Sequence, residues 1–212
     1  MRLAAIHYER GFDIDRLLIN VCRMLTTERL RIGGLVQLST GERGGNCAAT
    51  THIVDLRTGE KFDIWEDRGP CARGCRLDEA GLAHAEPALQ LAIDERVDLL
   101  VINRFGRAES LGRGLRTYFE AALAAGVPVL TGVRAPYDKA WREFHGGLGA
   151  ELACTATAAF DWTMRDAMGW SPNAITRVSQ NFGKFCLDVR LGTPMRPFVG
   201  ASVRPLDLQN RT

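Results

Sequence analysis

Short apolar runs alternate with stretches of helical spacing along most of this chain. The runs at 3–6, 98–103 and 127–131 are largely aliphatic, a pattern typical of strands buried on both faces of a sheet. Between them, apolar residues recur every three or four positions, as from Ile14 to Leu25, which indicates helices with one buried face. This alternation predicts an α/β fold with a mainly parallel sheet and helices on both faces.

The middle of the chain departs from this alternation. Strands predicted at 33–38, 49–56 and 61–65 follow one another, and a turn at 57–60 joins the last two. We therefore expect an antiparallel β-meander inserted into the sheet. Asp78 is the predicted N-cap of a helix at 79–96, which Pro87 should kink or restart. Further helices are predicted after the loop 104–114, ending at residue 125, and at 136–144 and 158–168. A last strand is predicted at 152–155.

The periodic pattern weakens after residue 155. We expect one domain over 1–155 and a C-terminal extension over 156–212, which packs on the domain or on a partner. The extension is rich in proline but also carries aromatic residues, which argues against a simply disordered tail. A homo-oligomer formed through this extension is one hypothesis.

Composition narrows the class of protein. Of the 212 residues, 46% are hydrophobic and the net charge is +2, as in ordinary globular proteins, and no strongly basic face predicts a nucleic-acid partner. No run approaches the roughly 20 apolar residues of a membrane span, and the apolar N-terminal part is too short for a signal peptide. We therefore expect a cytoplasmic protein without membrane insertion, whose six cysteines are not cross-linked.

Arginine-rich segments follow the predicted strands. In a parallel sheet the connections 7–13, 66–78 and 103–114 meet at the carboxyl edge, where ligands bind in such folds. The candidate ligand residues there are Arg73, Cys75, Arg76, Asn103, Arg104, Arg107, Glu109, Arg113 and His7. Guanidinium groups and backbone amides would form a pocket for a small anion. The alternative is a solvated loop in which Glu109 pairs with an arginine.

Cysteine and histidine leave several interpretations open. Cys71 and Cys75 supply only two thiols at a spacing unlike that of zinc sites, so they are weak metal candidates and no metal site is predicted. Neighbouring arginines would lower the pKa of either thiol and produce a reactive thiolate. The alternative is that both thiols only pack in the structure. His7 either faces the same pocket or acts as a core or capping residue.

The order of elements over about 3–155 resembles the cancer-related nucleoside-triphosphatase family, a compact P-loop fold. The segment 121–130 is similar to that family's last helix and strand. The strings Gly74-Cys75-Arg76-Leu77-Asp78, Asn103-Arg104-Phe105-Gly106-Arg107-Ala108-Glu109 and Gly112-Arg113-Gly114-Leu115-Arg116 resemble more closely an uncharacterised bacterial family of domains of unknown function. That family looks like a divergent branch of the same fold, whose members are often encoded near molybdate-transport genes. The resemblance implies no established activity.

The catalytic pattern of a P-loop hydrolase is absent. A working phosphate loop reads G-x-x-x-x-G-K-[ST], but the corresponding stretch His7-Tyr8-Glu9-Arg10-Gly11-Phe12-Asp13-Ile14-Asp15 has one glycine and no lysine. The strand that would carry the magnesium-site acids ends in Asn103 and Arg104. Carboxylates beside a triphosphate are repulsive by about 1 kcal/mol at 4 Å even in water. Binding of magnesium-NTP is therefore not expected, and no cofactor is predicted.

These observations favour a non-hydrolytic protein that binds a small anion, such as a molybdate-like oxyanion or a nucleotide phosphate. Its role would be regulatory, storage or delivery, for example in metal homeostasis. One alternative is a nucleotide phosphatase or transferase with an unconventional site, in which Glu109 or Asp78 acts as the base. Another is an oligomeric scaffold without a small ligand.

Overall fold

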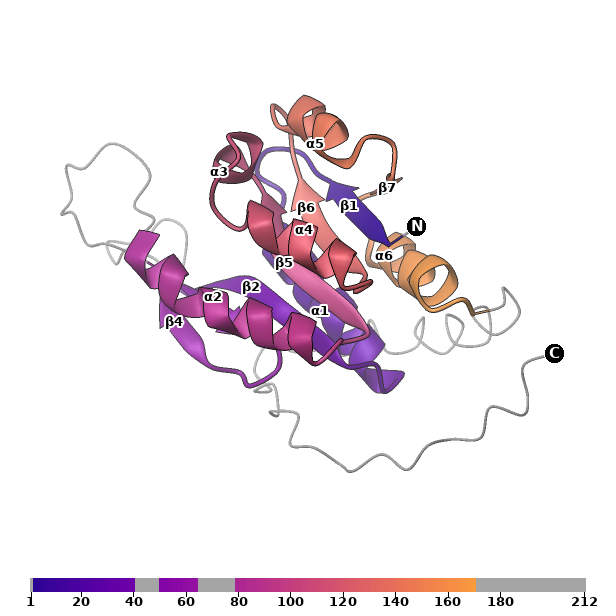
Figure 1. The fold of residues 1–212 in the computed structure, drawn as a ribbon, viewed down its shortest axis with the longest axis horizontal. Helices are drawn as coiled ribbons and strands as arrows, with labels where there is room; N and C mark the ends of the chain where they lie inside the picture. Colours follow the sequence, from indigo (N-terminus) through magenta and orange to yellow (C-terminus); the bar gives the residue numbers. More distant parts are fainter. Residues whose placement is uncertain (1, 41–49, 65–78, 171–212) are drawn as a thin grey trace.

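Seven strands form one mixed sheet in the order β4-β3-β2-β5-β6-β1-β7 in the computed structural model of this chain (Figure 1). The structure describes residues 2–40, 50–64 and 79–170. The strands are β1 (Leu3–His7), β2 (Ile32–Thr40), β3 (Thr50–Asp55), β4 (Lys61–Asp63), β5 (Leu99–Phe105), β6 (Val129–Val133) and β7 (Gly149–Leu152). All pairs from β2 to β7 along the sheet are parallel, whereas β2, β3 and β4 pair antiparallel.

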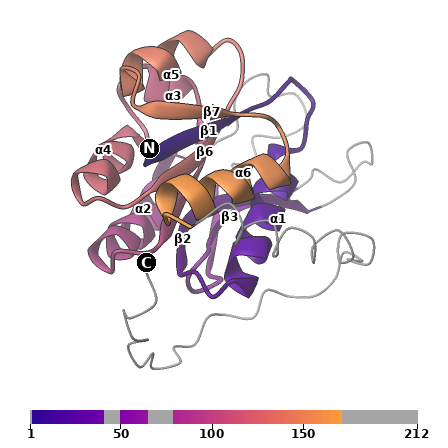
Figure 2. The ribbon, with the colours of Figure 1, turned by 90° about the vertical axis from the view of Figure 1, so that its right-hand side faces the viewer.

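Helices cover both faces of the sheet. They are α1 (Ile14–Thr27), α2 (Glu79–Asp94), α3 (Arg107–Ser110), α4 (Arg116–Ala124), α5 (Asp138–His145) and α6 (Ala156–Trp162), and a π-helical turn, η1 (Thr163–Ala167), continues α6. α1 and α6 lie on one face, and α2 and α4 lie on the other (Figure 2). The predicted α/β fold with an inserted antiparallel β-meander is confirmed.

Each face has its own hydrophobic core. Ile14, Leu18 and Phe160 belong to the core beneath α1 and α6, whereas Phe119 and Trp141 belong to the core on the opposite face. Helix α1 begins at Ile14, as predicted from the sequence. Its N-cap residue is Asp13, whose side chain accepts a hydrogen bond from the backbone amide of Arg16, the third helical residue. The fold therefore fixes where α1 starts, next to the carboxyl end of β1.

Several element predictions need correction. Pro87 lies inside α2 without ending it, and the connection after β5 contains the short helix α3 rather than only a loop. The strand expected at 152–155 is β7, which ends at Leu152, and the helix expected to start at Pro136 starts at Asp138. The loop 66–77 and the expected N-cap Asp78 lie outside the described residues.

The expected boundary at residue 155 precedes elements that pack on the domain. Phe160, Trp162 and Met164 are buried in the same core as α1. The part of the expected extension that the structure describes, 156–170, therefore lies against the sheet domain. The remainder, 171–212, lies outside the described residues.

Strand β5 contains an irregularity that changes which way its side chains point. Its register with β6 shifts between Ile102 and Arg104, so Asn103 is the extra residue of a β-bulge. Before the bulge, Val101 belongs to the core beneath α1. Strict alternation along the strand would place Phe105, four residues later, in the same core, but Phe105 belongs to the core on the opposite face. The bulge thus directs two consecutive side chains, those of Asn103 and Arg104, toward α1.

Gly34 lies where the backbones of the neighbouring strands β2 and β5 approach each other closely. Gly34 has a φ of +112°, and a Cβ placed there would lie 2.0 Å from the carbonyl oxygen of Val101 in β5. Neither backbone can move without breaking the sheet, so we expect Gly34→Ala to lower the free energy of unfolding by about 3 kcal/mol or more. Urea denaturation measures this change.

Gly59 provides the matched control. It also has a positive φ, +78°, but a Cβ there meets nothing within 4 Å. Gly59→Ala should therefore cost only the conformational penalty of about 1–2 kcal/mol. Equal losses in the two variants would contradict the close-approach explanation.

Candidate functional site

An ion pair joins the first turn of α1 to the end of β5. Both oxygens of the Asp15 carboxylate accept hydrogen bonds from Nη2 of Arg104, at 2.7 and 2.8 Å. The Asp15 side chain is 9% exposed and that of Arg104 is 36% exposed. This pair lies at the carboxyl edge of the sheet, between the end of β5 and the start of α1.

Two neutral side chains complete the arrangement around the pair. Nδ2 of Asn103 donates to Asp15 at 3.0 Å, and Nη1 of Arg104 donates to Oε1 of Gln37 in β2 at 2.8 Å. The β-bulge allows Asn103 and Arg104, although adjacent in sequence, to contact the same carboxylate. The carbonyl oxygen of the Asn103 side chain is buried and has no hydrogen-bond partner among the described residues.

Burial dominates the electrostatics of Asp15. Desolvation raises the pKa of this carboxyl group, and the charge of Arg104 opposes that rise. A buried carboxylate is costly unless paired, so Arg104 compensates a charge that the interior would otherwise disfavour. Asn103 and Arg104, both predicted as anion ligands, thus contact the carboxylate of Asp15 within the protein. Their role as ligands of an external anion stays a prediction.

Glu109 has a structural task in the connection after β5. Its buried carboxylate accepts hydrogen bonds from the backbone amides of Gly106, at 2.9 Å, and Leu115, at 3.1 Å. Among the described residues, the alternative in which the Glu109 side chain pairs with an arginine is not formed; the contact with Arg116 runs to the backbone oxygen of Glu109. The two amide contacts tie together the ends of the segment that contains α3.

Two predicted arginines, Arg107 and Arg113, lie in that segment and are exposed. Neither makes an ion pair or a side-chain hydrogen bond within the described part of the chain. Arg134, which directly follows β6 and is half-buried, was not among the residues predicted from the sequence. Burial raises the pKa of Tyr8, while the charges of Arg104 and Arg134 lower it, so both guanidiniums lie near this phenol.

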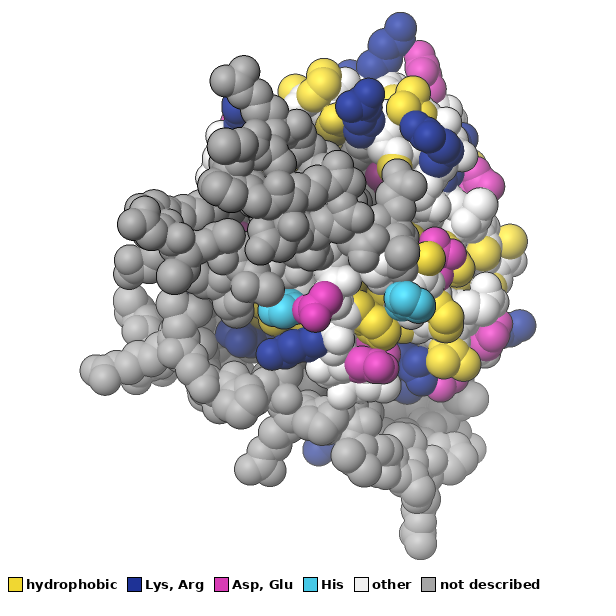
Figure 3. All heavy atoms as spheres, turned by 90° about the vertical axis from the view of Figure 1, so that its left-hand side faces the viewer, with side chains coloured by type: hydrophobic (Ala, Val, Ile, Leu, Met, Phe, Trp, Pro, Cys, Tyr) yellow, Lys and Arg dark blue, Asp and Glu magenta, His cyan; other side chains and the backbone are white. Residues whose placement is uncertain are grey.

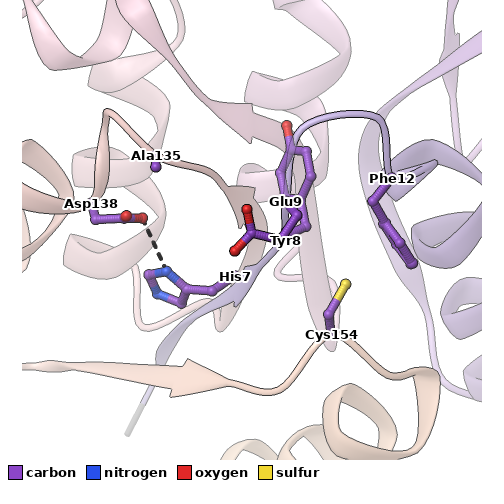
Figure 4. A pocket seen from close by; sticks show the side chains of 7 residues that line it. All are labelled: His7, Tyr8, Glu9, Phe12, Ala135, Asp138 and Cys154. Atoms are coloured by element: carbon purple, nitrogen blue, oxygen red, sulfur yellow. Dashed lines mark hydrogen bonds and ion pairs between the residues drawn. The ribbon is translucent and has the colours of Figure 1, made fainter.

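His7 lies in a cleft at the end of β1. The cleft has a volume of about 210 Å³. Its lining residues are His7, Tyr8, Glu9, Phe12, Ala135, Asp138 and Cys154 (Figure 4). Nδ1 of His7 is 3.2 Å from the Asp138 carboxylate, and its buried Nε2 has no described partner. Two carboxylates, those of Glu9 and Asp138, belong to this lining, and the assignment of His7 to an anion site stays a prediction.

The sequence pattern gave no signal for this cleft, because its residues come from three separated segments. The described thiols show no activation: burial raises the pKa of Cys22 to about 12 and also raises that of Cys154. The candidates Cys71, Arg73, Cys75 and Arg76 lie outside the described residues. Within the described ranges, no group of three or more metal-ligating side chains occurs, and no helix is long and apolar enough to cross a membrane.

The fold is similar to that of solved P-loop nucleoside triphosphatases. The structure superimposes on the solution structure of a human cancer-related nucleoside triphosphatase with a TM-score of 0.53 and 15% identity, over 90% of this chain and 100% of that one. The crystal structure of THEP1 from the hyperthermophile Aquifex aeolicus gives a TM-score of 0.52 and 15% identity, over 73% and 90% of the two chains. At this identity the likeness concerns the fold alone.

The chain belongs to the DUF2478 family of proteins of unknown function, whose model matches residues 3–162. One relative is named molybdenum import ATP-binding protein ModC 2, from Bradyrhizobium diazoefficiens (strain JCM 10833 / BCRC 13528 / IAM 13628 / NBRC 14792 / USDA 110). It is 42% identical over 161 residues. The match covers 76% of this chain but only 18% of that relative.

The Asp15–Arg104 pair predicts an asymmetric response to mutation. Arg104→Ala leaves a buried carboxylate and should lower the free energy of unfolding by about 3 kcal/mol at pH 7. Asp15→Ala leaves a guanidinium that water partly screens, so we expect a smaller loss of about 1–2 kcal/mol. The double variant should lose less than the sum of the two single variants.

The pH dependence supplies a second readout. Because the pKa of Asp15 is raised in the folded state, and rises further without Arg104, the folded form of Arg104→Ala takes up a proton more readily than the unfolded form. Its stability deficit relative to the original chain should therefore shrink as the pH falls from about 7 toward the unfolded pKa of about 4. Arg107→Ala, which removes an exposed arginine, serves as the control and should stay within about 0.5 kcal/mol.

Proposed function

We propose that this chain is a non-hydrolytic accessory domain of molybdenum import that binds a small oxyanion of the molybdate or phosphate class. The observation that carries the proposal is the Asp15–Arg104 pair at the start of α1. In a P-loop hydrolase, a lysine and a hydroxyl group at this helix start hold the terminal phosphates and magnesium. Here a carboxylate supplies the negative charge and a guanidinium the positive one, so the pair is neutral without nucleotide or metal.

The unpaired arginines support an anionic ligand. Arg107 and Arg113 are exposed at the carboxyl edge and have no acidic partner among the described residues. Guanidinium groups bind oxyanions through two parallel hydrogen bonds, which favours molybdate-like or phosphate-like ligands. We include Arg73 and Arg76 in the proposed site on the strength of their sequence positions alone.

The relative's name supports the biological setting. That name describes an ATP-binding protein of molybdenum import, and the matched segment is less than a fifth of its length. Since this chain lacks the lysine and hydroxyl residues of a phosphate loop, we assign to it a companion role and not ATP hydrolysis. That role would be to sense, store or deliver the oxyanion.

The alternative of a nucleotide phosphatase or transferase receives less support. Glu109, one of its two candidate bases, is 7% exposed and accepts two backbone hydrogen bonds. A general base must reach the proton that it removes, and this carboxylate is already occupied. The other candidate, Asp78, lies outside the described residues.

Calorimetric titration of the purified chain with molybdate tests the proposal. We expect saturable binding, and Arg107→Gln/Arg113→Gln should weaken it at least about tenfold, because two charge-assisted contacts of about 1.5–3 kcal/mol each are lost. The control variant Arg23→Gln/Arg29→Gln removes the same charge from exposed positions at and just beyond the far end of α1 and should bind as the original chain does.

Phosphate release from ATP and GTP is measured on the same preparation. We expect no release above that of a protein-free blank. Sustained turnover would contradict the non-hydrolytic assignment. Absence of binding to molybdate, tungstate, sulfate and phosphate alike would contradict the assignment of an oxyanion ligand.

A further inference from the structure

An apolar side chain stands exposed between the two unpaired arginines. Leu111 directly follows α3 and is 57% exposed, one of four large hydrophobic residues so exposed in the described ranges. Arg107 precedes it by one helical turn and Arg113 follows it by two residues, both exposed. We call residues 107–113 the Leu111 tip. On the face shown in Figure 3, Lys and Arg side chains lie beside hydrophobic ones in the upper part, at the level of α3 and α5.

The Leu111 tip is held in one conformation by its own hydrogen bonds. The amide of Arg113 donates to the oxygen of Ala108 at 2.9 Å, and the amide of Gly112 donates to the oxygen of Glu109 at 3.1 Å. The Glu109 carboxylate closes the base of the segment through Gly106 and Leu115. A segment fixed in this way loses little conformational entropy on binding, as is typical of an interface anchor.

We infer that the Leu111 tip docks into an apolar groove with a carboxylate rim on the ATP-binding protein of molybdenum import. Leu111 would fill the groove, and the rim carboxylates would pair with Arg107 and Arg113, which lack acidic partners in the described structure. The choice of partner rests on the proposed function. The relative is a longer protein named for ATP binding in molybdenum import, and one segment of it is similar to this chain. In that relative, the segment and the rest of the ATP-binding protein are therefore covalently joined.

The same two arginines serve both proposals, and this gives the tip a regulatory consequence. A tetrahedral oxyanion and a partner carboxylate need the same guanidinium hydrogen bonds, so they cannot occupy Arg107 and Arg113 together. Oxyanion binding therefore weakens docking, and docking weakens oxyanion binding by the same factor. The domain would release its partner when oxyanion is abundant.

Biolayer interferometry tests the docking surface, with the full chain immobilised and the purified molybdenum-import ATP-binding protein of the same genome in solution. We expect saturable binding that Leu111→Asp weakens at least about tenfold, as expected for an interface anchor. Leu91→Asp is the matched control, because Leu91 is a leucine of similar exposure, 52%, on α2. It should change the Kd by less than about twofold. Thermal unfolding checks that both variants remain folded.

Repeating the measurement with saturating sodium molybdate tests the competition, with sodium chloride of equal ionic strength as the reference. We expect molybdate to raise the Kd at least about fivefold. No binding by the original chain, or equal effects of Leu111→Asp and Leu91→Asp, would overturn the docking surface. If calorimetry shows that molybdate binds the chain but the Kd for the partner protein is unchanged in molybdate, the competition is overturned and the proposed function still stands. Docking that depends on Leu111 in a chain that binds none of molybdate, tungstate, sulfate and phosphate would support the surface and refute the oxyanion ligand.

Discussion

The pairing of a buried carboxylate with a guanidinium at the start of α1 governs the rest of this site. Asp15 lies where burial disfavours its charge, and Arg104 with Asn103 supplies the compensating hydrogen bonds. The start of α1 thus carries a charge pair formed by side chains of the protein itself. The cost of breaking a buried pair makes this arrangement hard to exchange for an external ligand.

The β-bulge in β5 links this pair to the packing of the whole domain. One extra residue, Asn103, turns two consecutive side chains toward α1 and returns Phe105 to the core on the other face. There, Phe105 packs edge-on against Phe119 and Trp141, with ring centroids 5.8 and 5.2 Å apart. The polar site and the aromatic core thus depend on the same local irregularity.

Much of the fold could be predicted from the sequence, because continuous aliphatic runs and helical spacing report directly on burial. The β-meander and the start of α1 followed from the same patterns. The bulge could not be predicted, since Val-Ile-Asn-Arg-Phe reads as an ordinary strand end until its pairing with β6 is known. For that reason the contact between Arg104 and Asp15, which lies 89 positions earlier in the chain, could not be predicted from the sequence. The cleft around His7 was missed because its residues meet only through tertiary structure.

The Asp15–Arg104 pair lies at the start of α1, and the exposed side chains of Arg107, Leu111 and Arg113 lie in the segment after β5. Our proposals of a non-hydrolytic role, an oxyanion ligand and a protein partner rest on these two features. A crystal structure grown with magnesium and a non-hydrolysable ATP analogue would test the central claim most directly. We predict that the Asp15–Arg104 pair is intact, with no phosphate at the start of α1. A triphosphate bound there, with the two side chains separated, would contradict the account.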